Sequence, residues 1–444
     1  MASRPPDMRL CYMDQGAFQG LRALDRGPVA GFTWVFAEPV DPVAVDALNH
    51  QLAQGFLGRL IQRSPLPWGR HRWVAAPVPA PVTTFDTPIG HPREPAWRGV
   101  LADLPIDPEC GPGWRLVVQP LAGGGAVLTL LVSHVVADGL AVCQAVADAV
   151  HRVPFAHRYP AARRGWSWRV LGDDLGRSIA EWPAVARALA ALVRQHPPVD
   201  AAAARPPRRP PVDPVAASAP VHVPLLYAIL DADQVQARAA AEGISVNTLI
   251  ACVAVRLGER VGRVGPDGHV LLVQPVSDRQ PGDLRGNALR ALQLVVDPTT
   301  CTAAPRELHD ALRRELAALR RSDPVTRLLP LIPYVPRWLV RKFERVALGA
   351  GRAVACSNLG TLDPAMVRPL GVRATQFYVS ILERHTAAAL AELGGKMLLV
   401  CSVVDGRMGL TALVWDPDRL LPADELAHHV RLTLADCGLT GTLP

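Results

Sequence analysis

The sequence contains very little lysine. Among its 47 basic residues only Lys342 and Lys396 are lysines, and with 40 acidic residues the formal net charge is +7. No block of five or six consecutive basic residues occurs, and the nearest cluster, at 206–211, is short and interrupted by prolines. An arginine excess of this kind, beside heavy use of alanine and proline, indicates a codon-composition bias. No nucleic-acid partner is therefore expected.

The sequence also lacks the features of a secreted or membrane-spanning chain. No uninterrupted apolar stretch approaches the roughly 18 residues that a spanning helix needs, and no apolar signal-peptide segment follows the N-terminus. The eight cysteines are scattered, lie mostly within apolar runs, and never form a C-x-x-C pair. We therefore expect buried thiols in a reducing compartment, and the cytoplasm is the expected location.

Missing motifs exclude several classes of enzyme. There is neither a G-x-S-x-G elbow nor a G-x-x-x-x-G-K-[ST] loop, so serine hydrolases and P-loop nucleotide triphosphatases are not expected. A metal site that used His134 and Asp138 would need a third ligand at a suitable spacing, and none lies nearby in the sequence. No metal is therefore expected.

The length and composition predict two domains around large cores. A chain of 444 residues, of which 49% are hydrophobic and 20% charged, fits two units of about 200 residues each. The segment 197–224 is rich in proline and alanine and predicts a linker between an N-terminal part, 1–196, and a C-terminal part, 225–444. Both parts alternate strand-like and helix-like patterns, which predicts an α+β fold.

The hydrophobic pattern predicts the following elements. Strands are expected at 31–37, 71–76, 114–120, 126–133, 225–230, 270–276, 289–296, 353–357, 372–380, 397–404 and 409–415. Helices are expected at 42–62, 139–152, 231–242, 245–262 and 422–437.

One candidate for general-base chemistry stands out. The strand 126–133 is almost continuously apolar, so it should lie centrally in its sheet, and it ends at His134. Asp138 is placed to cap the helix that begins near Gly139. A neutral imidazole at such a strand end can take a proton from an attacking alcohol or amine. A lone histidine there is more often a core residue, so the assignment depends on further sequence context.

The context is a family resemblance. Residues 133–139 read S-H-V-V-A-D-G, which resembles the H-H-x-x-x-D-G signature of the condensation-domain superfamily. This superfamily includes peptide-synthetase condensation domains, wax ester synthase/diacylglycerol acyltransferases and polyketide-associated acyltransferases. Other segments resemble the family in the same order, namely 113–116, 245–250, 274–279, 286–287 and 356–360. Ser133 departs from the usual first histidine, and the D-F-G-W-G element of plant acyltransferases is absent.

The resemblance implies two chloramphenicol-acetyltransferase-like lobes that form a V with a tunnel between them. The implied activity is transfer of an acyl group from coenzyme A or a phosphopantetheinyl carrier protein to an alcohol or amine, in lipid or natural-product biosynthesis. The thioester donor and a small-molecule acceptor would be the partners, with no further cofactor. The alternative, suggested by Ser133, is a non-catalytic relative that binds a carrier protein or lipid.

The resemblance also assigns roles to individual residues. His134 would be the general base, Asp138 would pair with Arg279, and simple helix capping by Asp138 is an equal alternative. The remaining candidates are Gly139 for close backbone approach, Asn287 for fixing a loop, and Ser357, Asn358 and Ser133 for contact with the oxyanion or substrate. The apolar segment 328–346 carries basic and aromatic residues, so it would lie at a membrane interface or shape an acyl tunnel. Its three prolines favour packing within the protein.

Overall fold

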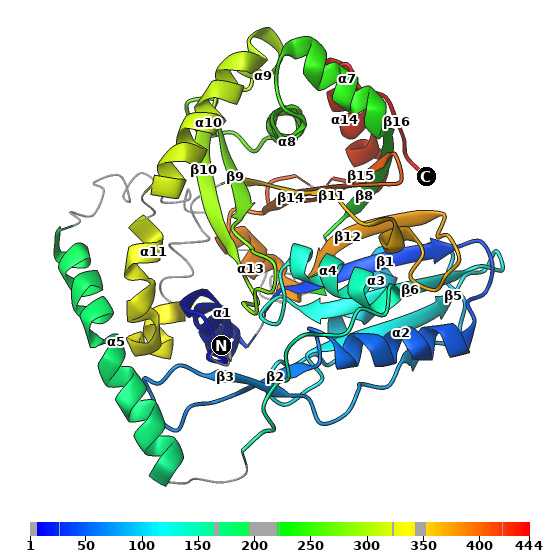
Figure 1. The fold of residues 1–444 in the computed structure, drawn as a ribbon. Helices are drawn as coiled ribbons and strands as arrows, with labels where there is room; N and C mark the ends of the chain where they lie inside the picture. Colours follow the sequence, from blue (N-terminus) through cyan, green and yellow to red (C-terminus); the bar gives the residue numbers. More distant parts are fainter. Residues whose placement is uncertain are drawn as a thin grey trace.

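The computed structural model describes residues 7–25, 27–163, 168–194, 220–221, 223–321, 324–341, 352–419 and 421–444. Most of the linker expected at 197–224 lies outside these residues. The described chain forms two larger β-sheets, one above the other in Figure 1, with helices on their outer faces. Strands and helices mix in both layers, which confirms the expected α+β class.

The first sheet has the strand order β12-β1-β6-β5-β4. Its central strand β6 is buried at every residue and lies in the middle of the sheet, as its apolar sequence predicted. The strands are β1 (Val29–Phe36), β4 (Thr83–Thr84), β5 (Trp114–Pro120), β6 (Ala126–Ser133) and β12 (Gln376–Leu382).

One strand crosses the division that we expected at residue 225. β12 comes from the C-terminal part of the chain but pairs antiparallel with β1, where Phe32 lies opposite Val379. On its other side β1 pairs antiparallel with β6, where Phe32 lies opposite Leu130. The first sheet therefore takes its edge strand from the C-terminal part.

The second sheet has the order β10-β9-β11-β14-β15-β8-β16 and is mostly antiparallel, although β11 runs parallel to both β9 and β14. Its strands are β8 (Leu225–Asp231), β9 (Val270–Ser277), β10 (Leu289–Val296), β11 (Val354–Thr361), β14 (Lys396–Val404), β15 (Arg407–Trp415) and β16 (Gly441–Thr442). Two small sheets complete the set, made by β2 (Arg59–Gln62) with β3 (Arg72–Ala75) and by β7 (Pro220–Val221) with β13 (His385–Thr386).

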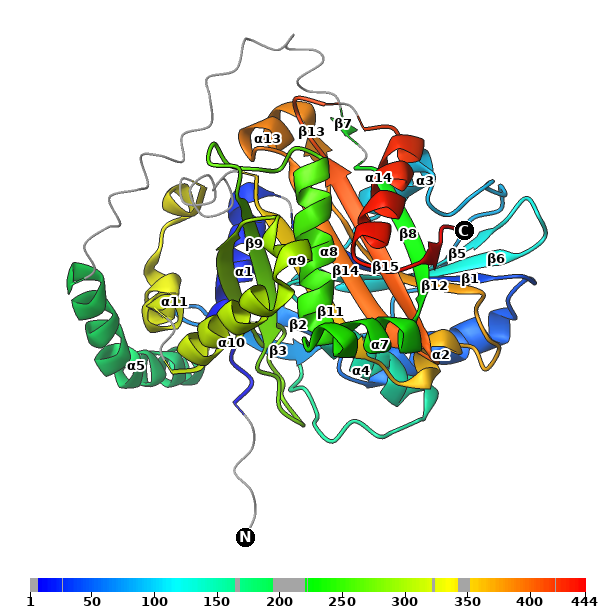
Figure 2. The same ribbon diagram turned by 90° about the horizontal axis from the view of Figure 1, so that it is seen from above.

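Helices cover the outer faces of the two sheets. α8 lies across the second sheet beside α7, α10 and α14, and their apolar faces share one core with β9, β11, β14 and β15 (Figure 2). The first sheet packs against α2, α4 and η3 on one face and against α3 on the other. The helices are α1 (Tyr12–Leu24), α2 (Pro42–Gln54), α3 (Pro95–Asp103), α4 (Gly139–Val150), α5 (Trp168–Arg194), α7 (Ala232–Glu242), α8 (Val246–Arg260), α9 (Thr300–Ala303), α10 (Pro305–Arg321), α11 (Pro324–Leu328), η2 (Leu329–Tyr334), η3 (Pro364–Val367), α13 (Ala387–Glu392) and α14 (Ala423–Asp436).

A helix expected at 42–62 is shorter in the structure. α2 ends at Gln54, and residues 59–62 instead form β2, which pairs with β3. Gly58 allows this change of direction, because a Cβ atom there would lie only 1.9 Å from the carbonyl oxygen of Ala53. The hydrophobic pattern therefore ran through a turn that the two glycines at 55 and 58 create.

Among the described residues no single helix is both long and apolar enough to cross a membrane. α7 and α8 pass that test only together, as a pair bent by 93°. α8 is largely buried in the core of the second sheet.

Candidate active site

His134 begins the short loop that joins β6 to α4. Its backbone N–H donates to the carbonyl of Pro28 at 2.9 Å, and the N–H of Val136 donates back to Ser133 at 2.8 Å. These bonds hold the loop in a tight turn at the end of a rigid, buried strand. The imidazole is partly buried and lines a cavity. The backbone of His134 is therefore held by the loop while its ring is accessible from the cavity.

Asn287 determines the tautomer of His134. The Nδ2 group of Asn287 donates to the backbone carbonyl of His134 at 2.9 Å, which leaves its Oδ1 facing the ring nitrogen Nδ1 at 3.0 Å. Because an amide oxygen only accepts, Nδ1 must carry the proton. Nε2 then keeps its lone pair, and it has no hydrogen-bond partner among the described residues. This is the tautomer that a general base at Nε2 requires.

Asp14, which the sequence pattern did not identify, holds Asn287 in turn. This carboxylate on α1 is fully buried and accepts from the backbone N–H groups of Gly286 at 2.8 Å and Asn287 at 2.7 Å. It also lies 3.3 Å from Nδ2 of Asn287. Burial raises the pKa of Asp14, against the opposing effect of these N–H groups and the Arg59 charge. Asp14 belongs to no motif in the sequence. The one feature that could have indicated this role is an acidic residue at a buried position of a helix.

Asp138 performs both of the roles that the sequence left open. Its Oδ1 accepts from the N–H of Ala141 at 2.8 Å and caps α4, while its Oδ2 lies 2.6 Å from Nη2 of Arg279. The N–H of Ala288 adds a bond to Oδ2 at 2.9 Å. Arg279 also donates to the carbonyl of Gly286 at 3.0 Å. The ion pair therefore joins the His134 loop to the segment that carries Asn287.

Arg59, the first residue of β2, supports the same loop. Its guanidinium is fully buried between the rings of Phe56 and Trp73, at 3.9 Å from each centroid. It donates to the carbonyls of Val136 and Leu284, both at 2.6 Å. A buried arginine with aromatic faces on both sides has little freedom to move, so it fixes the loop from a rigid base.

Gly286 is required where the loop after His134 meets the segment that carries Asn287. A Cβ atom there would lie 2.8 Å from the carbonyl oxygen of Val135, 2.9 Å from that of Val136 and 3.0 Å from Asp14. These distances leave no space for a side chain. The Gly-Asn pair at 286–287 therefore combines close approach with the amide that orients His134.

The fold has clear counterparts among solved structures. The first condensation domain of the CDA synthetase superposes with a TM-score of 0.56 at 15% identity, over 97% of this chain and 96% of that one. Wax ester synthase/diacylglycerol acyltransferase from Marinobacter aquaeolei VT8 gives 0.55 at 14% identity, over 97% and 98%. Polyketide synthase associated protein 5 from Mycobacterium tuberculosis gives 0.50 at 15% identity, over 98% and 99%.

This chain has the condensation-domain fold. The likeness extends over nearly the whole length of this chain and of each of these structures. No protein-family model and no curated protein sequence matches the chain. The fold thus agrees with the resemblance that the motif segments indicated.

In this condensation fold the remaining predicted residues lie around, but not within, the His134 cavity. Ser133 is buried in β6, next to His134 but outside the cavity lining. Ser357 and Asn358 lie on β11 but do not line the cavity. Ala355 on the same strand and Ala353 just before it do line the cavity. Asn358 instead accepts from the N–H of Gly360 at 2.8 Å.

Gly139 allows a close contact between α4 and β11. A Cβ atom at Gly139 would lie 3.0 Å from the side chain of Leu359, next to Asn358 in the sequence. The start of α4 thus packs closely against the Leu359 side chain of β11.

The His134 cavity has a volume of about 620 Å³, within the usual range of roughly 300–1,000 Å³ for small-molecule sites. α1, β11, β12 and β14 or their flanking residues form its walls, so both larger sheets contribute. Most lining side chains are apolar. The polar side chains in the lining are His134, Arg263, Glu383, His385 and Lys396.

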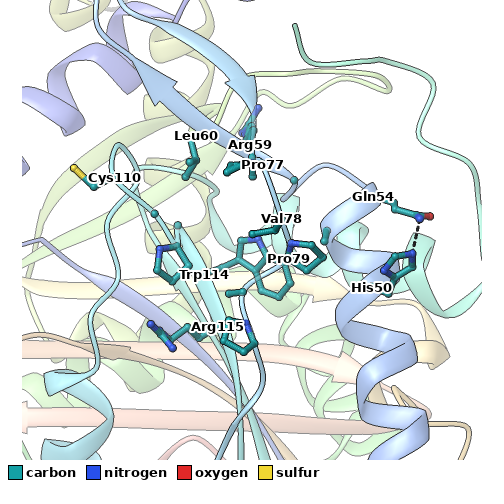
Figure 3. Close-up of a pocket in the computed structure, with 18 residues that line it drawn as sticks. His50, Gln54, Arg59, Leu60, Pro77, Val78, Pro79, Cys110, Trp114 and Arg115 are labelled. Carbon is teal, nitrogen blue, oxygen red and sulfur yellow. Dashed lines mark hydrogen bonds between the residues drawn. The ribbon is translucent and has the colours of Figure 1, made fainter. Parts of the chain in front are cut away.

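A second cavity lies elsewhere in the condensation fold. It has a volume of about 340 Å³ and is lined by α2, the segment Ala76–Pro81 and Trp114 at the start of β5. Figure 3 shows His50 and Gln54 at one side of it, with their Nε2 atoms 2.7 Å apart, and Arg115 at another. None of the predicted site residues lines this cavity.

In the described ranges no group of three or more His, Cys, Asp or Glu side chains is arranged to hold a metal ion. All eight cysteines are free thiols, and six of them are buried. Burial raises the pKa of the Cys356 thiol to about 12, so it stays protonated near neutral pH.

Proposed function

We propose that this protein is an acyltransferase with His134 as its general base. The observation that carries the proposal is the hydrogen bond between Asn287 Oδ1 and His134 Nδ1, which keeps the lone pair on Nε2 at a mostly apolar cavity. Structural neighbours that include condensation domains and a wax ester synthase/diacylglycerol acyltransferase support acyl transfer in general.

The proposed reaction joins an acyl thioester to an alcohol or amine. The acceptor oxygen or nitrogen attacks the thioester carbonyl while Nε2 of His134 takes its proton. The tetrahedral intermediate then expels the thiolate, which recovers the proton from the imidazolium. The products are an ester or amide and a free thiol, so no cofactor beyond the donor is consumed.

We further propose that the two sheets form the lobes of a V, with a tunnel that admits donor and acceptor from opposite faces. A cavity lined from both larger sheets supports this arrangement. Ser357 and Asn358 stay proposed contacts of the reacting carbonyl, and both lie outside the cavity lining. The backbone N–H of Gly139 is an additional candidate donor to the oxyanion.

The proposed donor is coenzyme A or a carrier-protein thioester, and the proposed acceptor is a small molecule in cytoplasmic lipid or natural-product synthesis. Condensation domains and a polyketide synthase associated protein among the structural neighbours support a thioester partner. Peripheral contact with a membrane is proposed at Tyr334 and Trp338, whose side chains are exposed beside Arg337.

Thiol release measures this function directly. Purified protein is offered acyl-CoA and acyl-carrier thioesters of several chain lengths with alcohol and amine acceptors. We expect His134→Ala to lower turnover by at least about 100-fold. His151→Ala, an exposed histidine after α4, is the matched control and should retain activity.

The same assay separates the alternative. Turnover that survives His134→Ala would contradict the general-base role. If the unmodified protein binds thioesters but releases thiol from none of them, the non-catalytic binding function suggested by Ser133 is correct.

A further inference from the structure

The His134 cavity contains a second polar group that the proposed reaction does not use. Glu383 and His385 follow β12, and Lys396 begins β14. Oε2 of Glu383 contacts Nζ of Lys396 and lies 2.7 Å from Nε2 of His385, while Nζ and Nε2 are 3.5 Å apart. All three side chains line the cavity. We call these three residues the Lys396 cluster.

Lysine at this position is notable in this chain. Lys342 and Lys396 are the only lysines among 47 basic residues, so arginine is used almost everywhere else. An ammonium group is a compact charge with three donors, whereas a guanidinium is a broad planar fork. Lys396 uses one donor on Glu383 and lies within reach of His385, so it has a further N–H for a ligand.

Arg263 adds a poorly neutralised charge to the same cavity. Its side chain is 2% exposed, and its hydrogen bonds run to the backbone carbonyls of Ala353 and Gly394, each at a long 3.3 Å. Burial lowers the pKa of Arg263 to about 10, and the charge of Asp416 only partly opposes this shift. Buried cations are usually paired with an anion, and here the guanidinium lines an open space.

Arg98 approaches the Lys396 cluster from the other side. A small cavity of about 20 Å³ is lined by Arg98 together with Glu383, His385 and Lys396. Arg98 is buried and donates to the carbonyl of Val223, and its Nε has no hydrogen-bond partner within the described residues. Burial lowers the pKa of Arg98 to about 10.

The balance of charge around this end of the cavity is positive. Arg98, Arg263 and Lys396 supply three cations, and among the residues that the structure describes Glu383 is the one carboxylate that lines the two cavities. Burial alone would raise the pKa of Glu383, but Lys396 and His385 outweigh it and lower that pKa, so the carboxylate stays ionised. A singly charged anion would bring this end closer to neutrality.

The rest of the lining is apolar. Leu21 and Leu24 come from α1, Ile381 from β12, and Leu393 and Met397 flank the start of β14. A ligand that fills this space needs an apolar body, because an unpaired polar group there would lose its hydration without compensation. Charge at one end and apolar walls elsewhere together define an amphipathic ligand.

We propose that the Lys396 cluster and Arg263 bind the carboxylate of a substrate whose apolar chain extends through the cavity toward His134. The carboxylate would accept from Lys396 and Arg263, while Glu383 and His385 hold the ammonium in place. The Glu383 carboxylate would repel a doubly charged phosphate more strongly than a singly charged carboxylate, so the site favours a carboxylate. The inference rests on the proposed function only for what happens at the His134 end.

Calorimetric binding of octanoate and octan-1-ol to the full chain tests this proposal, because the two probes share a chain and differ in the end group. Octanoate is expected to bind at least tenfold more tightly than octanol. Lys396→Met should remove most of that preference, and Lys396→Arg should retain it. Glu383→Gln should strengthen octanoate binding, since it removes the competing negative charge.

Two controls separate misfolding and failure of the proposed function from failure of this site. Glu383→Gln/Lys396→Met removes both members of the ion pair, so neither is left as an unpaired buried charge, and the variant should fold while losing the part of the preference that Lys396 contributes. His134→Ala should bind octanoate as the unmodified protein does, whether or not acyl transfer occurs. Equal binding of the two probes by the unmodified protein, or a preference in the folded double variant that is as large as in the unmodified protein, would overturn the proposal.

Discussion

Nδ1 of His134 lies 3.0 Å from Oδ1 of Asn287, whose own Nδ2 donates to the carbonyl of the same histidine. One amide thus contacts a single residue twice, once at the ring and once at the backbone. The double contact fixes both the position of the loop and the proton on the ring. Asp14 behind it prevents the amide from rotating, because Nδ2 also faces that carboxylate.

Loss of the Asn287 amide is expected to impair chemistry rather than binding. Asn287→Leu removes the acceptor for Nδ1–H, so the ring is free to adopt the wrong tautomer, and kcat should fall by roughly 10- to 1,000-fold. KM for the thioester should change by less than about threefold, since Asn287 does not line the cavity. Steady-state kinetics measures both constants.

Asn49→Ala is the matched control for this change. Asn49 on α2 also makes a buried amide bond, to the carbonyl of Ala80 at 2.8 Å, but contacts none of the site residues. Its kcat should stay close to that of the unmodified protein. A similar loss of kcat in both variants would indicate a general loss of stability, and the orienting role of Asn287 would be wrong.

The Asp138–Arg279 ion pair is expected to contribute strongly to stability. The two side chains are 7% and 14% exposed, so removal of either partner leaves a buried charge without its counterpart. Asp138→Ala and Arg279→Ala should each lower the free energy of unfolding by about 3–5 kcal/mol. The double variant should lose less than the sum, by about 1–3 kcal/mol.

Chemical denaturation of the four proteins gives this cycle. Asp138→Asn is a useful addition, because its Oδ1 can still cap α4 through Ala141. It should therefore be more stable than Asp138→Ala. Additive losses within about 0.5 kcal/mol would show that the pair is not coupled, contrary to the geometry.

His71 predicts a pH dependence of stability. Burial, aided by the Arg63 charge, lowers the pKa of His71 from its usual 6.5 to about 4, and Nδ1 accepts from the N–H of Ser64 at 3.2 Å. Between these values the unfolded chain binds a proton that the folded chain does not. This contribution is therefore complete above pH 6.5 and is lost as the pH falls toward 4, by up to about 3 kcal/mol.

His71→Asn keeps an acceptor near Ser64 but cannot be protonated in this range. The free energy of unfolding, measured by urea denaturation from pH 7 to pH 4, should fall less steeply in this variant than in the unmodified protein. If the two slopes agree within error, His71 does not account for the pH dependence.

The sequence by itself determined the elements whose residues are almost all apolar or carry a local signal. β5 and β6 have the predicted bounds, since a continuously buried strand leaves a run of apolar residues. Ser245 caps α8 as expected, because its hydroxyl needs only the N–H of Thr248. The place of His134 at the end of β6 follows from the same local order.

Only the tertiary structure decided which distant segments meet. The pairing of β12 with β1 joins residues more than 300 positions apart in sequence. The sequence of an apolar strand does not indicate which sheet the strand will join. Asp14 and Asn287 are separated by 273 positions, and Asp14 belongs to none of the motif segments. A buried carboxylate acquires its role from the N–H groups that surround it, and these come together only when the chain has folded.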